Sequence, residues 1–197
     1  MEAITVAFFG ISGSGKGTQV SLLDKALHDR DPVRAVVKPE MGNLLRAFMQ
    51  TGTPMARSIG DILNVGGLVP SFMPIYLLTK IFNESFDGSQ HIVLDGVCLR
   101  KDQSRAANDL MRMFGREKLQ AIVLNLSEEN AKTRLGGRGR FDDAKDAAIQ
   151  SRFRWYKDEV VPSIEELRAC GWTIHEIDGE PDIQTVHKNI LKQLQLV

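Results

Sequence analysis

A glycine-rich segment containing one lysine carries the clearest chemical signal in this sequence. It follows an apolar run at residues 4–9 and precedes a helical pattern. Glycines let backbone N–H groups turn inward around a phosphate chain, and the N-terminus of a following helix attracts anions. Lys16 can reach β- and γ-phosphates, so we predict a P-loop for a nucleoside triphosphate rather than a glycine-rich turn with an incidental lysine. The predicted phosphate-binding residues are Gly10, Ser12, Gly13, Ser14, Gly15, Lys16, Gly17 and Thr18.

A second signal is the apolar run at residues 91–94, which ends in Asp95 and Gly96. In P-loop enzymes, an aspartate at such a strand end holds the Mg²⁺ that bridges the β- and γ-phosphates, directly or through water. A strand that ends in Asp-Gly can also be a simple turn, but the glycine-rich loop favours the metal site. We therefore expect Mg²⁺ as the cofactor, with Asp95 holding it through water.

Basic residues concentrate between residues 132 and 154, interleaved with glycines at 136, 137 and 139. Arginines on a glycine-rich loop suit a lid that closes on phosphoryl oxygens and excludes water. The alternative is a solvated basic surface, which the glycines make the weaker interpretation. We predict a short lid at residues 135–143. The basic residues are Lys132, Arg134, Arg138, Arg140, Lys145, Arg152 and Arg154.

Short apolar runs alternate with helical stretches along the whole chain. We predict strands at residues 4–9, 33–37, 91–94, 119–126 and 172–177, and a first helix at 19–30. Parallel neighbours need crossover connections, so this alternation indicates an α/β three-layer P-loop fold with a central five-stranded parallel sheet. Residues 1–197 are expected to form one domain, with its core at 1–40, 89–134 and 144–197. Residues 41–88 contain helical pieces without a strand and are expected to be an insertion.

Composition limits the remaining possibilities. The 197 residues are 43% hydrophobic, and the 25 Lys and Arg side chains balance the 25 Asp and Glu side chains, so no nucleic-acid polymer is expected as a partner. Cys98 and Cys170 form no CxxC pair, which argues against a disulfide scaffold and a cysteine zinc site. No apolar stretch approaches the ~18 residues of a membrane span, and no signal-peptide pattern opens the chain. We expect a cytoplasmic monomer that acts on small molecules.

In order along the chain, these motifs resemble those of the adenylate kinases and the related short nucleoside monophosphate kinases. The Gly15–Thr18 ending of the P-loop looks like this family's form. Residues 42–46 (GNLLR) resemble its thr-gly-asp-leu-leu-arg segment, and residues 66–70 (GGLVP) its gly-x-leu-val-pro-asp segment. Residues 94–96 (LDG), with Gln103 beyond them, resemble its asp-gly-phe-pro-arg motif and the glutamine that follows. Residues 134–143, Arg152 and residues 177–179 are similar to its lid, the arginine after it and the end of its last strand.

This resemblance implies phosphoryl transfer from Mg·ATP to a nucleoside monophosphate, with a helical acceptor-binding insertion at 41–88 and a short, zinc-free lid. It assigns the donor adenine to Arg134 and Gly179. Arg138, Arg140 and Arg152 would act with Lys16 on the transferred group. The acceptor-binding residues that it implies are Gly42, Arg46, Gly67, Val69, Gly96 and Gln103.

The departures from the family pattern lie on the acceptor side. Leu99 replaces the acceptor-phosphate arginine, Met41 and Asn43 replace a threonine and an aspartate, and Ser71 replaces the aspartate after Val-Pro. Arg100 could substitute for the arginine only if its loop changes register. AMP is the expected acceptor because Gln103 is present, with a pyrimidine monophosphate as the next candidate. A nucleotide-binding protein with weak or lost kinase activity, and a kinase for a non-AMP acceptor, are the alternatives.

Overall fold

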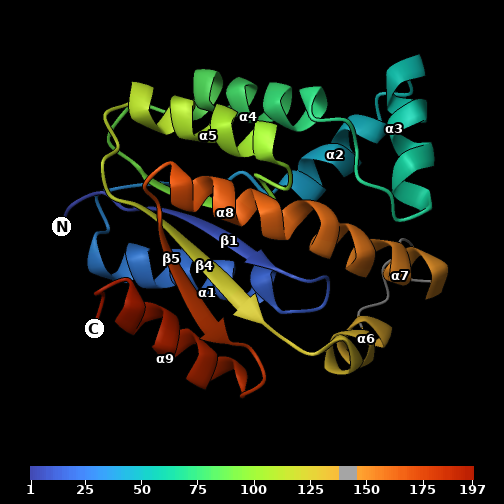
Figure 1. Ribbon diagram of the computed structural model, residues 1–197. Coiled ribbons are helices and arrows are strands. Elements are labelled where there is room, and N and C mark those ends of the chain that lie inside the picture. The colour runs from blue at the N-terminus through green and yellow to red at the C-terminus, as the bar shows by residue number, and fades with distance from the viewer. Residues whose placement is uncertain (138–145) are drawn as a thin grey trace.

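Five parallel strands form the centre of the computed structural model, which describes residues 1–137 and 146–197 (Figure 1). The strands are β1 (Thr5–Gly10), β2 (Val36–Val37), β3 (His91–Asp95), β4 (Leu119–Asn125) and β5 (Thr173–Asp178). Their order across the sheet is β2-β3-β1-β4-β5, and every neighbouring pair is parallel. The predicted five-stranded parallel sheet is therefore confirmed.

Helices cover both faces of this sheet, as Figure 1 shows. Helices α1 (Lys16–Arg30) and α9 (Ile183–Gln193) lie on one face, and α4 (Phe72–Ser85), α5 (Lys101–Met113) and α8 (Val161–Ala169) lie on the other. Successive strand residues point to opposite faces, so Val6 and Phe8 pack in the cluster with α1 and α9. Ala7 and Phe9 pack in the cluster on the other face. This burial on both sides explains the continuous apolar runs, and the predicted three-layer fold is confirmed.

Two predicted elements differ by more than one residue at an end. The predicted strand at residues 33–37 is reduced to β2 (Val36–Val37), because Arg34 turns back to donate its backbone N–H to the Asp31 carbonyl and Val33 is 95% exposed. The first helix begins at Lys16, three residues earlier than predicted. Gly15 precedes it with φ +90°, a left-handed conformation that a glycine adopts readily.

Residues 41–88 contain three helices: α2 (Met41–Met49), α3 (Pro54–Asn64) and α4. The hydroxyl of Thr53 caps α3 by accepting the backbone N–H of Ala56 at 3.1 Å, and Pro54 follows it at a position where a helix needs no N–H. Helices α6 (Glu128–Gly136) and α7 (Asp146–Trp155) precede and follow the residues that the structure leaves undescribed.

A π-helical turn, η2 (Tyr156–Val160), joins α7 to α8. Pro162 stands in the first turn of α8. Its ring would collide with the carbonyl four residues earlier in a regular α-helix, and the wider turn before it relieves that crowding. The run from α7 to α8 therefore continues without a break.

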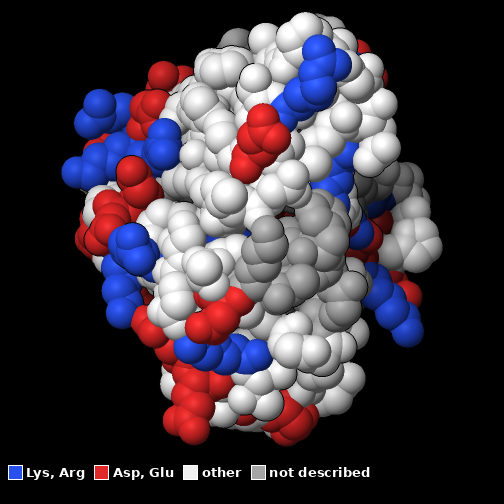
Figure 2. Space-filling view, turned by 90° about the vertical axis from the view of Figure 1, so that its right-hand side faces the viewer, with Lys and Arg blue, Asp and Glu red and all other residues white. Residues whose placement is uncertain are grey.

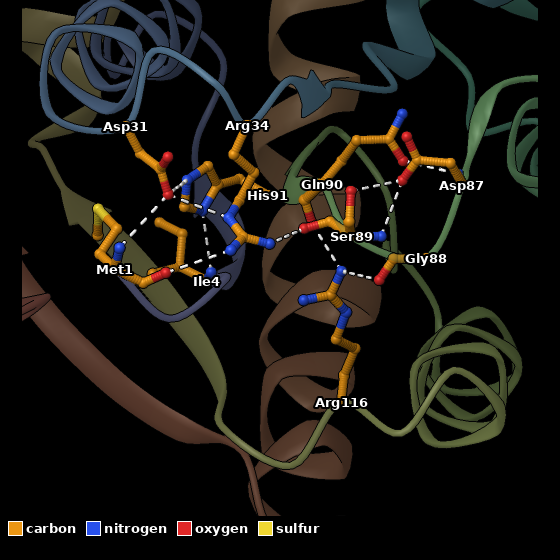
Figure 3. Close-up of polar contacts among 10 residues, drawn as sticks. All are labelled: Met1, Ile4, Asp31, Arg34, Asp87, Gly88, Ser89, Gln90, His91 and Arg116. Carbon is orange, nitrogen blue, oxygen red and sulfur yellow. Dashed lines mark hydrogen bonds and ion pairs between the residues drawn. The ribbon is translucent and has the colours of Figure 1, made fainter.

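A polar network closes the end of the sheet at which the strands begin (Figure 3). His91 is fully buried, and its Nδ1 accepts the backbone N–H of Ile4 at 3.0 Å. Its Nε2 lies 3.7 Å from the Asp31 carboxylate. Arg34 donates to the Ser89 carbonyl, and Arg116 donates to the carbonyls of Gly88 and Gln90 at 3.2 and 2.6 Å. The loop before β3 is thus fastened to the segments that precede β2 and β4, and the start of β3 to the residue that precedes β1.

Basic and acidic side chains are interspersed over the side of the molecule that carries α3, α6 and α7 (Figure 2). Within residues 1–137 and 146–197, no helix combines the length and the apolar composition required to cross a bilayer.

Candidate functional site

A cavity of about 1170 Å³ opens where the strands end. Ligands bind in α/β proteins at this edge, because the loops after parallel strands meet there. Every described residue of the predicted site lines the cavity, which brings together segments from the whole chain. They are Gly10, Ser12, Gly13, Ser14, Gly15, Lys16, Gly17, Thr18, Gly42, Arg46, Gly67, Val69, Asp95, Gly96, Gln103, Arg134, Arg152 and Gly179.

The glycine-rich loop after β1 has the backbone that its sequence predicts. Gly13 and Gly15 both have φ +90°. A Cβ on Gly13 would stand 2.6 Å from the carbonyl oxygen of Ala131, so this glycine lets α6 pack against the loop. A Cβ on Gly15 would meet no atom within 4 Å and would project into open space. Lys16 donates its ammonium to the carbonyls of Gly10 and Ile11 at 2.5 and 3.1 Å, within the loop itself.

Asp95 ends β3 beside the start of α1. A Cβ on Gly17 would stand 3.9 Å from the Asp95 carboxylate, which places an anionic oxygen next to the phosphate-binding loop. In the described part of the chain, no group of three or more His, Cys, Asp or Glu side chains forms a metal-binding cluster. Mg²⁺ commonly binds through one or two carboxylates, with waters and substrate phosphates completing its shell, so this arrangement fits that ion.

Arg134 and the segment after β5 form one end of the cavity. The Arg134 guanidinium donates to the carbonyl of Gly179 at 3.0 Å and lies 3.4 Å from that of Glu180. The Glu180 carboxylate accepts the backbone N–H of Ser127 at 2.8 Å and the Asn130 amide at 2.6 Å, and these hydrogen bonds, led by that from Ser127, lower its pKa. The start of α6 is thereby fixed to the end of β5.

The opposite end contains Arg46 on α2. Its guanidinium donates to the Asn43 side-chain oxygen at 2.5 Å, and the Asn43 amide donates to Glu40 at 2.5 Å. Met41 is buried at 1% exposure and lines the same region. Asn43 therefore orients Arg46 without adding the negative charge that the family's aspartate would bring.

The loop after Asp95 keeps the register that its sequence implies. Leu99 lines the cavity, whereas Arg100 is directed to the Glu159 carboxylate, with 3.8 Å between the two side chains. Cys98 has φ +63° and is fully buried, and the Ser163 hydroxyl donates to its carbonyl at 2.5 Å. Burial raises the pKa of its thiol to about 12. The arrangement does not bring Arg100 into the position of the missing arginine.

Gln103 is almost fully buried, and protein groups engage both ends of its side-chain amide. The oxygen accepts the backbone N–H of Leu99 at 3.0 Å, and the nitrogen donates to the Ser71 hydroxyl at 3.3 Å. Ser71 in turn donates to Asp102 at 2.9 Å. Gln103 therefore joins the start of α4 to the loop after β3.

The cavity also contains residues that sequence reasoning missed. Trp155 and Tyr156 line it, although adjacent aromatic residues after a lid are more simply interpreted as core packing. Burial raises the pKa of Tyr156 to about 12. Glu40 and Ile183 line it too and carry no motif that could have identified them. Arg138 and Arg140, and with them most of the predicted lid at 135–143, lie outside the described residues.

Comparisons with known proteins identify the family. The family model described as adenylate kinase matches residues 8–171 of this chain. The chain belongs to the adenylate kinase family. Similar relatives are the adenylate kinases of Mycolicibacterium smegmatis (31% identical, covering 90% of this chain and 93% of the relative) and Nocardia farcinica (30% identical, 96% and 98%). That of Mycolicibacterium vanbaalenii is 27% identical, with 96% and 98% covered.

The resemblance seen in the motifs is therefore confirmed. As a member of the adenylate kinase family, the chain is a nucleoside monophosphate kinase, a phosphotransferase that binds nucleotides and uses ATP.

Proposed function

We propose that this chain transfers the terminal phosphoryl group of Mg·ATP to AMP, so that ATP and AMP give two ADP. One observation carries the proposal. A single cavity is lined both by the P-loop and by Gly42, Arg46, Gly67 and Gln103, which the family pattern assigns to the acceptor. Donor and acceptor sites that share one cavity allow direct transfer, because enzymes of this class act mainly by positioning and by stabilising charge.

The donor half of the cavity is assigned as follows. The loop N–H groups and Lys16 bind the donor phosphates, and on ATP binding the Lys16 ammonium exchanges its carbonyl contacts for phosphate oxygens. Arg134, held beside Gly179, flanks the donor base. Mg²⁺, when bound with ATP, neutralises charge on the β- and γ-phosphates, and Asp95 would hold it through water.

The acceptor half follows from the insertion at residues 41–88. Arg46 binds the acceptor phosphate. The rest of the monophosphate is surrounded by Gly42, Gly67, Val69, Gly96 and Gln103. Arg152 stabilises charge on the transferred group, together with Arg138 and Arg140 of the lid at residues 135–143. We propose that one chain suffices for the reaction and that free nucleotides are its substrates.

A second acceptor remains a candidate because of Leu99. Its apolar side chain lines the cavity where the family has an arginine, and Met41 adds a second apolar surface. Leu99 stands where the family pattern has the acceptor-phosphate arginine and Met41 where it has the threonine that reads adenine, so contacts expected for AMP are absent and a pyrimidine monophosphate is the alternative acceptor.

The test is a coupled assay of ADP release with Mg·ATP and a panel of AMP, CMP, UMP, dTMP and GMP, with a blank that lacks acceptor. Lys16→Ala is the inactive control. The matched control is Lys80→Ala, because Lys80 is a half-exposed lysine on α4 whose ion pair with Glu84 is weak, at 4.0 Å.

Turnover fastest with AMP, lost in Lys16→Ala and kept in Lys80→Ala, would support the proposal. Faster turnover with another monophosphate would replace AMP as the acceptor. No turnover on the whole panel, with ATP binding still measurable, would contradict it and favour a nucleotide-binding protein without transfer activity.

A further inference from the structure

Trp155, the last residue of α7, connects that helix to the insertion at residues 41–88. Its indole N–H donates to the carbonyl of Gly66 at 2.9 Å. Gly66 lies in the loop between α3 and α4, 89 positions away in the sequence. A half-buried indole N–H usually finds a partner, but this partner belongs to the segment that carries the proposed acceptor residues Gly67 and Val69.

Gly66 also lies against α7 at Ala148, about two turns closer to the N-terminus of the helix. It has φ +69°, and a Cβ added to it would stand 2.4 Å from the carbonyl oxygen of Ala148. A side chain at this position would therefore push the loop away from the helix. The backbone of the loop lies directly against α7 because residue 66 is a glycine.

The two contact points lie on either side of Arg152. Ala148, Arg152 and Trp155 are spaced i, i+4 and i+7 on one helix, which places them along a single face. Arg152 and Trp155 both line the cavity, as does Gly67, the neighbour of Gly66. The loop at residues 65–69 is thus held against the helix both before and after the arginine.

We propose that Trp155 is a positioning residue: by holding the carbonyl of Gly66, it sets where Arg152 stands relative to the acceptor. This inference rests on the proposed role of Arg152 in phosphoryl transfer. Trp155 needs no contact with substrate for this role. Its hydrogen bond fixes the loop at residues 65–69 relative to Arg152. Small displacements of a group that acts on the transferred phosphoryl reduce rates steeply.

The first test is Trp155→Phe, which keeps an aromatic ring and removes the indole N–H. We expect kcat to fall about 10-fold while KM for ATP stays unchanged, because the donor half of the cavity is not involved. The matched control is Trp172→Phe. Trp172 is buried away from the cavity, and its indole N–H donates to the Asn108 side chain at 3.3 Å. This variant should lower the melting temperature and leave kcat unchanged.

The second test does not depend on turnover. In ¹⁵N-labelled protein the two indole N–H signals are assigned with the two Trp→Phe variants, and that of Arg152 Nε–H with Arg152→Lys. Gly66→Ala should speed exchange of the Trp155 indole proton and leave that of Trp172 unchanged. The Arg152 signal should shift in Trp155→Phe and in Gly66→Ala, and not in Trp172→Phe.

The kinetic and NMR measurements test the positioning role of Trp155 separately. A kcat in Trp155→Phe equal to that of wild type, or equal losses in the two Trp→Phe variants, would overturn the positioning role. If wild type turns over no monophosphate, the proposed function fails, and the Arg152 signal then decides the inference by itself. An Arg152 signal that stays in place in Trp155→Phe would overturn it.

Discussion

The backbone N–H of Leu99 donates to the side-chain oxygen of Gln103 at 3.0 Å. This bond joins the residue that departs most from the family pattern to one that keeps it. Gln103 holds the loop after β3 in a register that directs Leu99 into the cavity and Arg100 towards Glu159. An apolar side chain therefore lines the cavity at the proposed acceptor side, and replacing it tests that assignment.

Leu99→Arg should lower KM for AMP by about 10- to 100-fold. A new arginine–phosphate contact is a charged hydrogen bond of about 1.5–3 kcal/mol, which corresponds to that factor. Initial rates against AMP concentration, at saturating Mg·ATP, measure it. Arg100→Ala is the control and should change KM for AMP little, since Arg100 faces Glu159. A larger effect of Arg100→Ala than of Leu99→Arg would show that the loop changes register in solution.

Asp95→Asn should reduce turnover about 10- to 100-fold at low Mg²⁺, with part of the loss restored by raising Mg²⁺. A carboxylate that holds the ion through water contributes on this scale. Turnover is measured over a Mg²⁺ titration, and chelation with EDTA should abolish it in the wild type. Asp109→Asn, at an exposed position of α5, is the matched control. An unchanged Mg²⁺ dependence in Asp95→Asn would remove Asp95 from the metal site.

Gly13→Ala and Gly15→Ala should separate packing from nucleotide binding. Both residues have φ +90°, so both variants carry a backbone cost of about 1–2 kcal/mol. Only Gly13→Ala adds a collision, with the carbonyl of Ala131, and it should lower the melting temperature further, by roughly 2–4 °C for each additional kcal/mol. Gly15→Ala puts a methyl group into the open cavity and should lose more ATP affinity than stability. Thermal melts and ATP titrations would contradict this if the two variants behaved alike.

His91 should make the protein less stable as the solution becomes acidic. Burial is the main cause that lowers its pKa, Arg34 adds to this, and Asp31 acts in the opposite direction. The unfolded chain therefore takes up a proton near pH 6.5 that the folded chain still refuses. The free energy of unfolding should be constant above about pH 7 and fall as the pH decreases through 6.5, by at most about 1.4 kcal/mol per pH unit for one group.

Urea unfolding between pH 7.5 and 5.5 measures this effect in wild type and in His91→Gln. His187→Gln serves as a comparison, because burial also lowers the pKa of His187 and its contribution has the same sign. Each variant should show a smaller decrease than wild type. A decrease in His91→Gln as large as that of wild type would assign the effect to other groups.

Local patterns predicted much of this molecule correctly. The glycines and lysine of residues 10–18 predicted the loop, because their conformations depend on neighbours within a few positions. The apolar runs predicted the positions of all five strands, and in β1, β3 and β4 the run is nearly continuous because a strand buried on both faces has to be apolar. The edge strand β5 has only Ile177 buried. Asp95 and Arg134 were found through short motifs at element ends, and the structure brings both to the cavity.

The tertiary structure decided what depends on distant segments. The sequence alone determined the family and the five-stranded parallel sheet, and it predicted the residues proposed to bind the donor, because each is encoded in contiguous motifs. It did not indicate that Gln103 bonds to Ser71, that Arg100 faces Glu159, or that Trp155 reaches Gly66. These contacts arise only when helices pack together, and the direction of a side chain is then set by the partners that surround it rather than by its neighbours in the chain.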